Sequence, residues 1–446
     1  MDLFSKEKGS VNVLTLIIIA VLVFCLVFVV LELIKSNHVI DNTAVVQNST
    51  SGGEIDVPDE PDEPIEDVDV KSEDFAVEFL KMESKSNNKT NIIYSPLSIK
   101  YALNLLKEGA EGSTKEEIEN VLGDTSLTKY KNIEDVLSLA NGVYIREEFK
   151  NKVLDSYNKT VEDKLNAEIM YDDFKSAKNI NKWIENKTFG IINNFFDDGD
   201  IAEKPELKMI LLNALAIDMD WASRFNTDDT SGGIFDKDGS SLNVAYMKKE
   251  SVYDESISYK IEDDVTVLAM DLEEYDGTTL EFDAIMPNEE SLDSFISNID
   301  SKKIDKYLSN LNNLSEVDED TDINIKIPKF DFDYSINLKN ELMAMGIKKA
   351  FGYSADFSNI TGDDSLFVSD AKHKADIEFS EEGIKAAAVT AMMMNEKMAL
   401  PNDVVNIDID KPFMFVIRDK KTGEVWFVGS VYNPVLWDDV KTEYGR

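Results

Sequence analysis

The sequence predicts one α+β domain, in which helices pack on large β-sheets, preceded by one transmembrane helix and an acidic linker. Three observations predict this: an uncharged apolar run near the N-terminus, a Pro- and acid-rich segment after it, and interleaved helix and strand patterns from Ser72 to Pro434. The chain has 446 residues, 43% of them hydrophobic, so it can bury a large core. The expected parts are 1–12, a cytoplasmic N-terminus; 13–34, the membrane helix; 35–71, the linker; 72–434, the folded domain; and 435–446, a C-terminal tail.

The apolar run VLTLIIIAVLVFCLVFVVL, residues 13–31, contains no charge and is long enough to cross a bilayer as a helix. Two lysines precede it, and after Lys35 no Lys or Arg occurs until Lys71, which favours a cytoplasmic N-terminus. A cleaved signal peptide is the alternative, but no small-x-small cleavage pattern follows the run. We therefore expect an uncleaved signal-anchor that crosses the cell membrane once, with the folded domain on the extracytoplasmic side.

The segment 36–70 holds ten Asp or Glu residues, no Lys or Arg, no aromatics and the phrase VPDEPDEPIEDVD. Such a composition cannot form a core, so this linker should stay extended and hold the domain away from the membrane surface. The formal net charge of −41 argues against a nucleic-acid partner. The acidity is typical of a solvated, self-repelling surface, and steering of a basic partner is the alternative.

The inventory of catalytic and metal-binding residues is small. Cys25, the single cysteine, lies in the apolar run, so a disulfide framework and a cysteine zinc site are excluded. His38 and His373 are the only histidines, and no Walker loop or GxGxxG run occurs. We expect no cofactor and no metal. A Ser-His-Asp hydrolase would have to depend on His373. This hydrolase is the weakest of the functional alternatives.

Helix patterns come first along the domain. They are SEDFAVEFLKM after a Ser cap, SIKYALNLLKEGAEG ended by glycine, GSTKEEIENVLG with a capping box from Ser113 to Glu116, FKSAKNINKWIENKT and INLKNELMAMGI.

Strand patterns are interleaved with these helices. VTVLAMDLEEYDGTTLEFDAIMP predicts two strands around an Asp276-Gly277 turn, and KPFMFVIRDKKTGEVWFVGSVYNP predicts a hairpin that turns at 421–423. INIKIPKF alternates apolar and polar residues, which is typical of a half-buried strand whose buried side chains are Ile323, Ile325 and Ile327. No repeat or Pro-rich break divides 72–434, so we expect one domain.

The run EEGIKAAAVTAMMMNEKMALP, residues 381–401, is unusual in so acidic a chain. Ala and Met favour helix, while the Gly-Ile opening and the Val-Thr pair oppose it. Taken alone, the run is compatible with an ordinary helix or a buried strand.

Five segments in order resemble the serpin family over nearly all of Ser72 to Pro434. They are NIIYSPLSIKYALNLLKEGAEGSTKEEI, LLNALAIDMDWASRF, IKIPKF followed by LKNELMAMGIKKAF, SDAKHKADIEFSEEGIKAAAVTA, and IDKPFMFVIRDKKTGEVWFVGSVYNP. The resemblance implies a serpin fold of about nine helices on three β-sheets, with an exposed reactive centre loop at about 381–406. It also implies a suicide-substrate inhibitor: a target serine protease cleaves the loop, which inserts as a central strand of the main sheet and traps the acyl-enzyme.

The resemblance assigns roles to three groups of residues. The hinge of the loop is Glu381, Glu382, Gly383, Ile384, Lys385, Ala386, Ala387 and Ala388. The shutter, a polar cluster beneath the main sheet, is Ser95, Ser98, Asn213 and His373. The breach, where the loop begins to insert, contains Trp221 and Lys329, and Lys329 matches a salt-bridge partner of Glu381. If that pair were solvated, it would contribute little stability.

The loop sequence suits insertion between two strands. Alternate side chains of a strand point to opposite faces, and one face would receive only uncharged residues: Ile384, Ala386, Ala388, Thr390, Met392 and Met394. Lys385 falls on the other, more open face. No proline interrupts this stretch.

Family spacing counted from Gly383 implies a reactive bond between Lys397 and Met398, and hence a trypsin-like target protease. The loop is longer than usual on its C-terminal side, so Met394–Asn395, Met398–Ala399 and Leu400–Pro401 remain alternatives. We expect a monomer. A non-inhibitory serpin that is cut as a plain substrate, or that binds ligands or partners, stays open, as does inhibition of a cysteine protease.

Overall fold

The computed structural model describes residues 75–444, except 88, 124–126, 203, 205–206, 319–320, 364–365 and 385–402. These residues belong to one compact unit, Asp59–Arg446. The expected cytoplasmic, membrane and linker segments lie outside the described residues. Within the described part, none of the helices has both the length and the apolar character that a membrane span requires.

The main sheet has seven strands and carries the hinge. Its strands are β2 (Leu137–Arg146), β3 (Ala167–Asp172), β4 (Met209–Ile217), β5 (Met219–Asp220), β13 (Phe330–Asn337), β14 (Asp370–Phe379) and β15 (Gly383–Ile384). The order is β3-β2-β4-β14-β15-β5, and β13 pairs with the other edge of β14. Strands β2 and β4 are antiparallel and pair at nine positions. Strands β4 and β14 are parallel and pair at two, Asp370 with Ile210 and Ala371 with Leu211, so this is the weaker junction in the middle of the sheet.

The second sheet contains the two predicted turns, at Asp276-Gly277 and at 421–423, and both are confirmed. Its order is β1 (Ile92–Tyr94), β18 (Val425–Val431), β17 (Phe413–Asp419), β10 (Leu280–Pro287), β9 (Val265–Asp271), β8 (Ile257–Ile261) and β11 (Asn312–Asn313). Asp276 and Gly277 both have positive φ between β9 and β10, as a tight hairpin turn requires. Gly423 also has positive φ in the turn that joins β17 to β18.

The third sheet receives the chain where it leaves the loop. Its order is β16 (Asp403–Asp408), β12 (Thr321–Pro328), β7 (Ser240–Lys249) and β6 (Ser231–Lys237). Strand β12 has the predicted alternation, because Ile323, Ile325 and Ile327 are buried and the residues between them are partly exposed. Strand β16 begins directly after the undescribed part of the loop.

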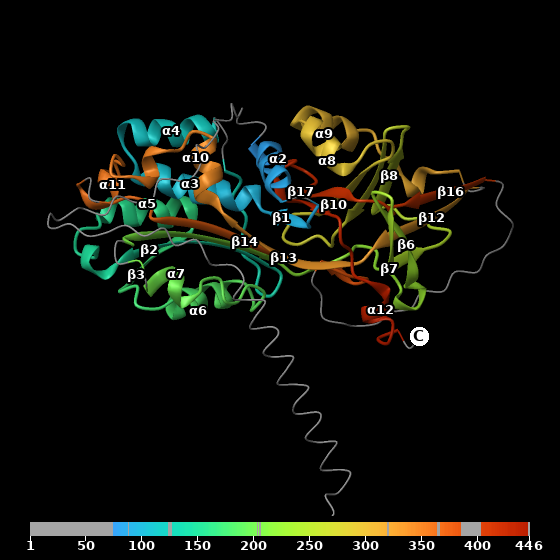
Figure 1. The fold of residues 1–446 in the computed structure, drawn as a ribbon, viewed down its shortest axis with the longest axis horizontal. Coiled ribbons are helices and arrows are strands. Elements are labelled where there is room, and N and C mark those ends of the chain that lie inside the picture. The colour runs from blue at the N-terminus through green and yellow to red at the C-terminus, as the bar shows by residue number, and fades with distance from the viewer. Residues whose placement is uncertain are drawn as a thin grey trace, which may run out of the picture. The chain divides into compact units, whose positions relative to one another are not determined.

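Eleven α-helices occur in the described ranges, where about nine were expected. They are α2 (Phe75–Ser86), α3 (Pro96–Gly109), α4 (Gly112–Leu122), α5 (Asp155–Leu165), α6 (Lys178–Lys187), α7 (Asp198–Ala202), α8 (Leu292–Asn298), α9 (Ser301–Leu308), α10 (Leu338–Ala344), α11 (Ser358–Thr361) and α12 (Trp437–Val440). Short 3-10 helices are η2 (Glu147–Phe149), η3 (Thr227–Asp229), η4 (Leu314–Glu316) and η5 (Lys349–Phe351). Helices α3 and α5 lie on one face of the main sheet and α6 and α7 on the other (Figure 1).

The predicted capping box in α4 is wrong. The helix already begins at Gly112, with Glu111 at the N-cap, so Ser113 lies inside the first turn. The neighbouring hydroxyl of Thr114 accepts a hydrogen bond from the N–H of Asp356 at 3.0 Å. The Thr114 hydroxyl therefore makes a tertiary contact rather than a cap.

An aromatic cluster joins the main sheet to the second sheet. The ring of Phe330 stacks on that of Phe379 at 4.4 Å, and both rings contact Phe282 of the second sheet. Phe330 also stacks on Phe415 of that sheet. Burying each such side chain contributes roughly 1.5–3 kcal/mol. Strands β13 and β14 are thereby attached to the second sheet.

Candidate functional site

The first four hinge residues lie at one end of the main sheet. The remaining hinge residues, Lys385 to Ala388, and the predicted reactive bond, Lys397–Met398, lie outside the described residues, within 385–402. The described chain stops at Ile384 in the main sheet and resumes at Asp403 in the third sheet.

Gly383 and Ile384 already form a short strand between two others. Ile384 pairs antiparallel with Phe379 of β14 on one side and with Met219 of β5 on the other. Its side chain is 2% exposed and belongs to the same apolar cluster as Trp221 and Phe379. The start of the loop is thus already a strand of the main sheet.

Gly383 is needed for this close approach. A Cβ at this position would lie 2.7 Å from the Cα of Asp220 and would overlap the carbonyl oxygen of Met219. Both neighbours are backbone atoms, which cannot rotate away as a side chain can. Glycine therefore allows β15 to approach β5 closely enough to pair with it.

Glu381 is buried in a network of hydrogen bonds at the base of the loop. Its side chain is only 5% exposed, and its Oε2 lies 2.7 Å from the Nζ of Lys329, so the predicted ion pair is present and is not solvated. Its Oε1 accepts hydrogen bonds from the hydroxyls of Thr230, at 2.6 Å, and Tyr444, at 2.7 Å. Burial opposes ionisation of this carboxyl, but the Lys329, Thr230 and Tyr444 contacts outweigh it and lower the pKa of Glu381.

Trp221 holds the backbone that precedes the hinge strand. Its indole N–H donates to the carbonyl of Ser380 at 2.9 Å, and its backbone N–H donates to the carbonyl of Glu382 at 2.9 Å. The N–H of Phe225 donates to the carbonyl of Glu381 at 2.8 Å. Three consecutive carbonyls, 380–382, are therefore fixed by the segment that follows β5.

The four shutter residues meet beneath the junction of β4 and β14. The N–H of Ser95 donates to Nε2 of His373 at 3.0 Å, and the N–H of Ser98 donates to the Ser95 hydroxyl oxygen at 3.0 Å. The Asn213 amide donates to Oδ1 of Asn141, a residue of β2 that the sequence reasoning missed. An asparagine within the apolar strand LSLANGVYI was the available signal.

Burial keeps His373 neutral, since it lowers the pKa of the imidazole to about 4. The Nε2 lone pair already accepts the Ser95 N–H, so it is not available to take a proton from a nucleophile. His373 here is a structural acceptor that connects β14 to the start of α3.

Two polar atoms of the shutter lack partners. The hydroxyl oxygen of Ser98 and Oδ1 of Asn213 are buried and accept or donate no hydrogen bond within the described residues. Both residues line a cavity of about 10 Å³, together with His373. Unpaired buried polar atoms are costly, so a hydrogen-bonding group that entered between β4 and β14 would be stabilised here.

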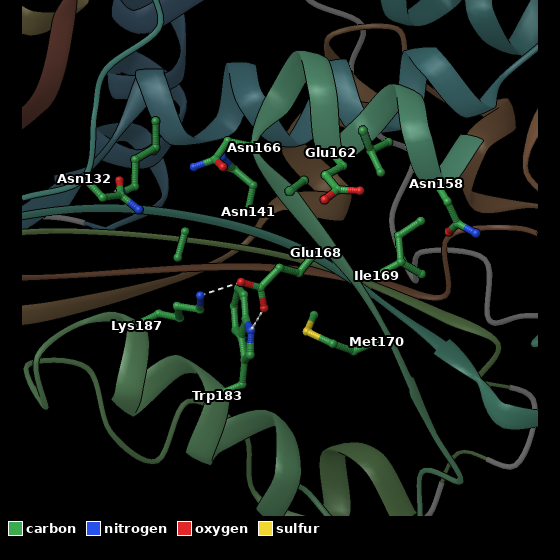
Figure 2. A pocket seen from close by; sticks show the side chains of 14 residues that line it. Asn132, Asn141, Asn158, Glu162, Asn166, Glu168, Ile169, Met170, Trp183 and Lys187 are labelled. Carbon is green, nitrogen blue, oxygen red and sulfur yellow. Dashed lines mark hydrogen bonds and ion pairs between the residues drawn. The ribbon is translucent and has the colours of Figure 1, made fainter. Parts of the chain in front are cut away.

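A larger cavity of about 580 Å³ opens where β3 begins beside β2 (Figure 2). Figure 2 shows Glu168 facing Trp183 and Lys187: its Oε2 accepts a hydrogen bond from the Trp183 indole and its Oε1 accepts one from the Lys187 ammonium. Polar side chains of α5 and its C-cap line the other wall: Asn158, Glu162 and Asn166. Asn141 lines this cavity and also accepts from Asn213, so the cavity and the shutter share one side chain.

Comparison with known proteins identifies relatives of this arrangement. The family model described as "Serpin (serine protease inhibitor)" matches residues 70–434. Iripin-8 of Ixodes ricinus is 30% identical over 375 residues, which cover 78% of this chain and 89% of Iripin-8. A serine protease inhibitor of Cyanea capillata is 29% identical over 384 residues, 81% of this chain and 97% of the relative. The solved complex of thyroxine-binding globulin with thyroxine has a TM-score of 0.68 at 27% identity and covers 82% of this chain and 98% of that one.

Proposed function

The chain belongs to the serpin family, and we propose that it inhibits a serine protease as a suicide substrate. The catalytic serine of the protease attacks the carbonyl carbon of Lys397, the bond to Met398 breaks, and the new amino group of Met398 departs. The loop N-terminal to the cut then enters the main sheet between β14 and β4 while the protease is still esterified to Lys397. A lysine at the cut suits a trypsin-like specificity pocket.

The observation that carries the proposal is the hinge strand β15. Because it already pairs with both β14 and β5, insertion needs no new nucleus and can proceed by adding residues to an existing strand. Continuing the two registers would bring successive loop residues between successive pairs of core-facing side chains. These are Ala386 between Ile377 and Ile217, Ala388 between Ala375 and Leu215, and Thr390 between His373 and Asn213.

The position of Thr390 in this register supports insertion. Its hydroxyl would reach the level of the shutter, where Oδ1 of Asn213 and the hydroxyl oxygen of Ser98 lack partners among the described residues. The following residue on this face, Met392, would reach the level of Ala371 and Leu211, one of the two existing pairs between β14 and β4. Complete insertion would thus break the two residue pairs between β4 and β14. The inserted strand would in return form hydrogen bonds with β14 along one edge and with β4 along the other.

The starting fold in this proposal is held kinetically, since a more stable, inserted arrangement is available but slow to reach. Cleavage of Lys397–Met398 should therefore raise the melting temperature sharply. If heating curves before and after cleavage coincided, the trap would not exist.

The direct test is to mix the full chain with trypsin and look for an adduct that survives SDS. Mass analysis of the released fragment then identifies the bond, and distinguishes Lys397–Met398 from the three alternatives. K397A should lose the adduct, and the matched control K385A should keep it because Lys385 falls on the open face. Cleavage without adduct in the wild type would overturn the proposal.

A matched pair of loop variants tests the insertion path. T390R should still be cleaved at Lys397 but should behave as a substrate, because an arginine would have to be buried beside His373 without a partner. K385R adds no charge and should remain an inhibitor. Equal adduct yields from both variants would contradict the register.

Two other functions compete with this one. Thyroxine-binding globulin, a relative in fold and sequence, was solved with thyroxine, so a ligand-binding role without inhibition is the first rival. It predicts turnover of the loop without adduct. A hydrolase that uses His373 is the second, and its turnover would have to disappear in H373Q; the occupied Nε2 lone pair argues against it.

We further propose that residues 13–34 anchor the protein in a membrane, with the domain 72–434 held as a monomer on the extracytoplasmic side. The support is the uncharged run at 13–31, the lysines before it and the acidic linker after it. Protease protection in sealed membrane vesicles tests this orientation. Digestion of the N-terminus rather than the domain in right-side-out vesicles would contradict it.

A further inference from the structure

The segment that follows β18 runs back to the base of the reactive loop. Its Val435 is tied to two neighbouring stretches of chain, since its N–H donates to the carbonyl of Lys329 and its carbonyl accepts from the N–H of Ala245, both at 2.9 Å. The indole ring of Trp437, in α12, covers Gly232 so closely that a Cβ there would lie 2.6 Å from it. The segment is therefore bound along its length to β7 and β6 before it reaches the hinge.

The segment ends on the buried ion pair of the hinge. The hydroxyl of Tyr444 accepts a hydrogen bond from Nζ of Lys329 at 2.5 Å and donates one to Oε1 of Glu381 at 2.7 Å. The ammonium of Lys329 also lies 5.3 Å from the centre of the Tyr444 ring. The ring of Trp437 stacks on that of Tyr444 at 5.7 Å and holds it in place. One side chain thus bridges both members of the pair.

We propose that residues 435–444 are a latch on the hinge, and that Tyr444 is a positioning residue that slows insertion of the reactive loop. The proposal rests on the inhibitory function proposed above. Its basis is that Glu381 is fixed by Lys329, Thr230 and Tyr444 only two residues before Gly383, the first residue of β15.

The chemistry of the bridge suits a restraint that can be released. Burial and the nearby carboxylate of Glu381 raise the pKa of Tyr444 to about 12, so the hydroxyl keeps the proton that it donates. Hydrogen bonds to charged groups are stronger than neutral ones and depend on short distances. Parting of β14 from β4 would shift the end of β14 against the C-terminal segment and lengthen these bonds, so the cost falls at the beginning of insertion.

The latch also gives a role to Tyr444, to which the family resemblance assigned none. The ion pair between Glu381 and Lys329 would exist without the C-terminal segment, but Oε1 of Glu381 would lose one of its two hydroxyl donors. The latch therefore modulates a site that is already formed, and its removal should change the rate of opening rather than the fold.

The test compares Y444F with the wild type in the full, uncleaved chain. Phenylalanine removes both hydrogen bonds and keeps the ring on Trp437. The control is Y353F, because Tyr353 is 59% exposed and far from the hinge in sequence. The probe is a synthetic peptide with the sequence of residues 385–395, which begins after the paired Ile384, and its uptake is followed by native gel without any protease.

We expect Y444F to take up the peptide about ten-fold faster than the wild type and Y353F, equivalent to about 1.4 kcal/mol. Amide hydrogen exchange at Trp221 and Phe225, which donate to the carbonyls of Glu382 and Glu381, should become faster in Y444F alone. Unchanged uptake and unchanged exchange in Y444F would overturn the latch. If Y444F takes up peptide faster but no variant forms an adduct with trypsin, the latch stands and the inhibitory function fails.

Discussion

If the chain inhibits as proposed, replacing Gly383 by alanine should convert it from an inhibitor into a substrate. The added Cβ would lie 2.7 Å from the Cα of Asp220 and would overlap the carbonyl oxygen of Met219. Alanine could adopt the backbone conformation of Gly383, so the obstacle is steric. The pairing of β15 with β5 would have to loosen, and in the proposed mechanism insertion proceeds from this strand pair.

The magnitude follows from the kind of clash. Forcing one extra carbon against backbone atoms typically costs about 1–3 kcal/mol. Because the same close approach must persist while the loop extends from β15, this strain acts on the insertion step. At about 1.4 kcal/mol per factor of ten, insertion should slow by roughly 5- to 150-fold. Hydrolysis of the acyl-enzyme competes with insertion, so most G383A molecules should be cleaved without trapping the protease.

The assay measures how many inhibitor molecules are consumed for each trypsin molecule that is trapped. The matched control is G352A, since a Cβ at Gly352 would meet no atom within 4 Å. We expect a much larger consumption for G383A and wild-type behaviour for G352A. If G383A trapped trypsin as efficiently as G352A, the argument from the close approach of β15 and β5 would be refuted.

Three further predictions concern the packing and the buried titratable groups. F330A should lower the free energy of unfolding by about 3–5 kcal/mol in denaturant titrations, because Phe330 stacks within the aromatic cluster; Y353A, at an exposed position, should change it little. Burial and the neighbouring Glu83 raise the pKa of Glu341 to about 7, so its contribution to stability is complete below pH 4.5 and is lost as the pH rises through 7. E341Q should therefore lack that decline in unfolding measurements between pH 4.5 and 8, and an identical decline would contradict the assignment. His373 has the opposite sign: its pKa falls from 6.5 to about 4, so stability present above pH 6.5 is lost as the pH falls through 4. Uptake of the loop peptide should accelerate over that range in the wild type and not in H373Q.

The elements predicted most reliably are those that local chemistry determines. The turn at Asp276 and Gly277 needs two residues that accept positive φ, and the sequence supplies them. The alternation of Ile323, Ile325 and Ile327 reports a strand with one buried face. The capping box at Ser113 is wrong because α4 begins one residue earlier, at Gly112. The nearby hydroxyl of Thr114 instead bonds Asp356, which is 242 residues away and could not be foreseen from a local motif.

The site residues that were missed have partners far away in the sequence. Asn141 meets Asn213 across 72 residues, Thr230 meets Glu381 across 151, and Tyr444 meets Glu381 across 63. None of these pairs forms a motif, and each becomes visible only when the fold brings the two side chains together. The family resemblance supplied Glu381 with its partner Lys329, and Asn213; the structure supplied Thr230, Tyr444 and Asn141.

The two-pair junction between β4 and β14 defines a length scale for designed blockers of this protein. A synthetic strand of six residues, with the sequence of Lys385 to Thr390, would fill the gap from the paired Ile384 to the level of His373 and leave both pairs of β4 with β14 intact. A strand longer by two residues would reach the pair of Ala371 with Leu211, and one longer by four would also have to separate Asp370 from Ile210. The length of the blocker should therefore distinguish compounds that only fill the space beside β14 from compounds that also separate β14 from β4.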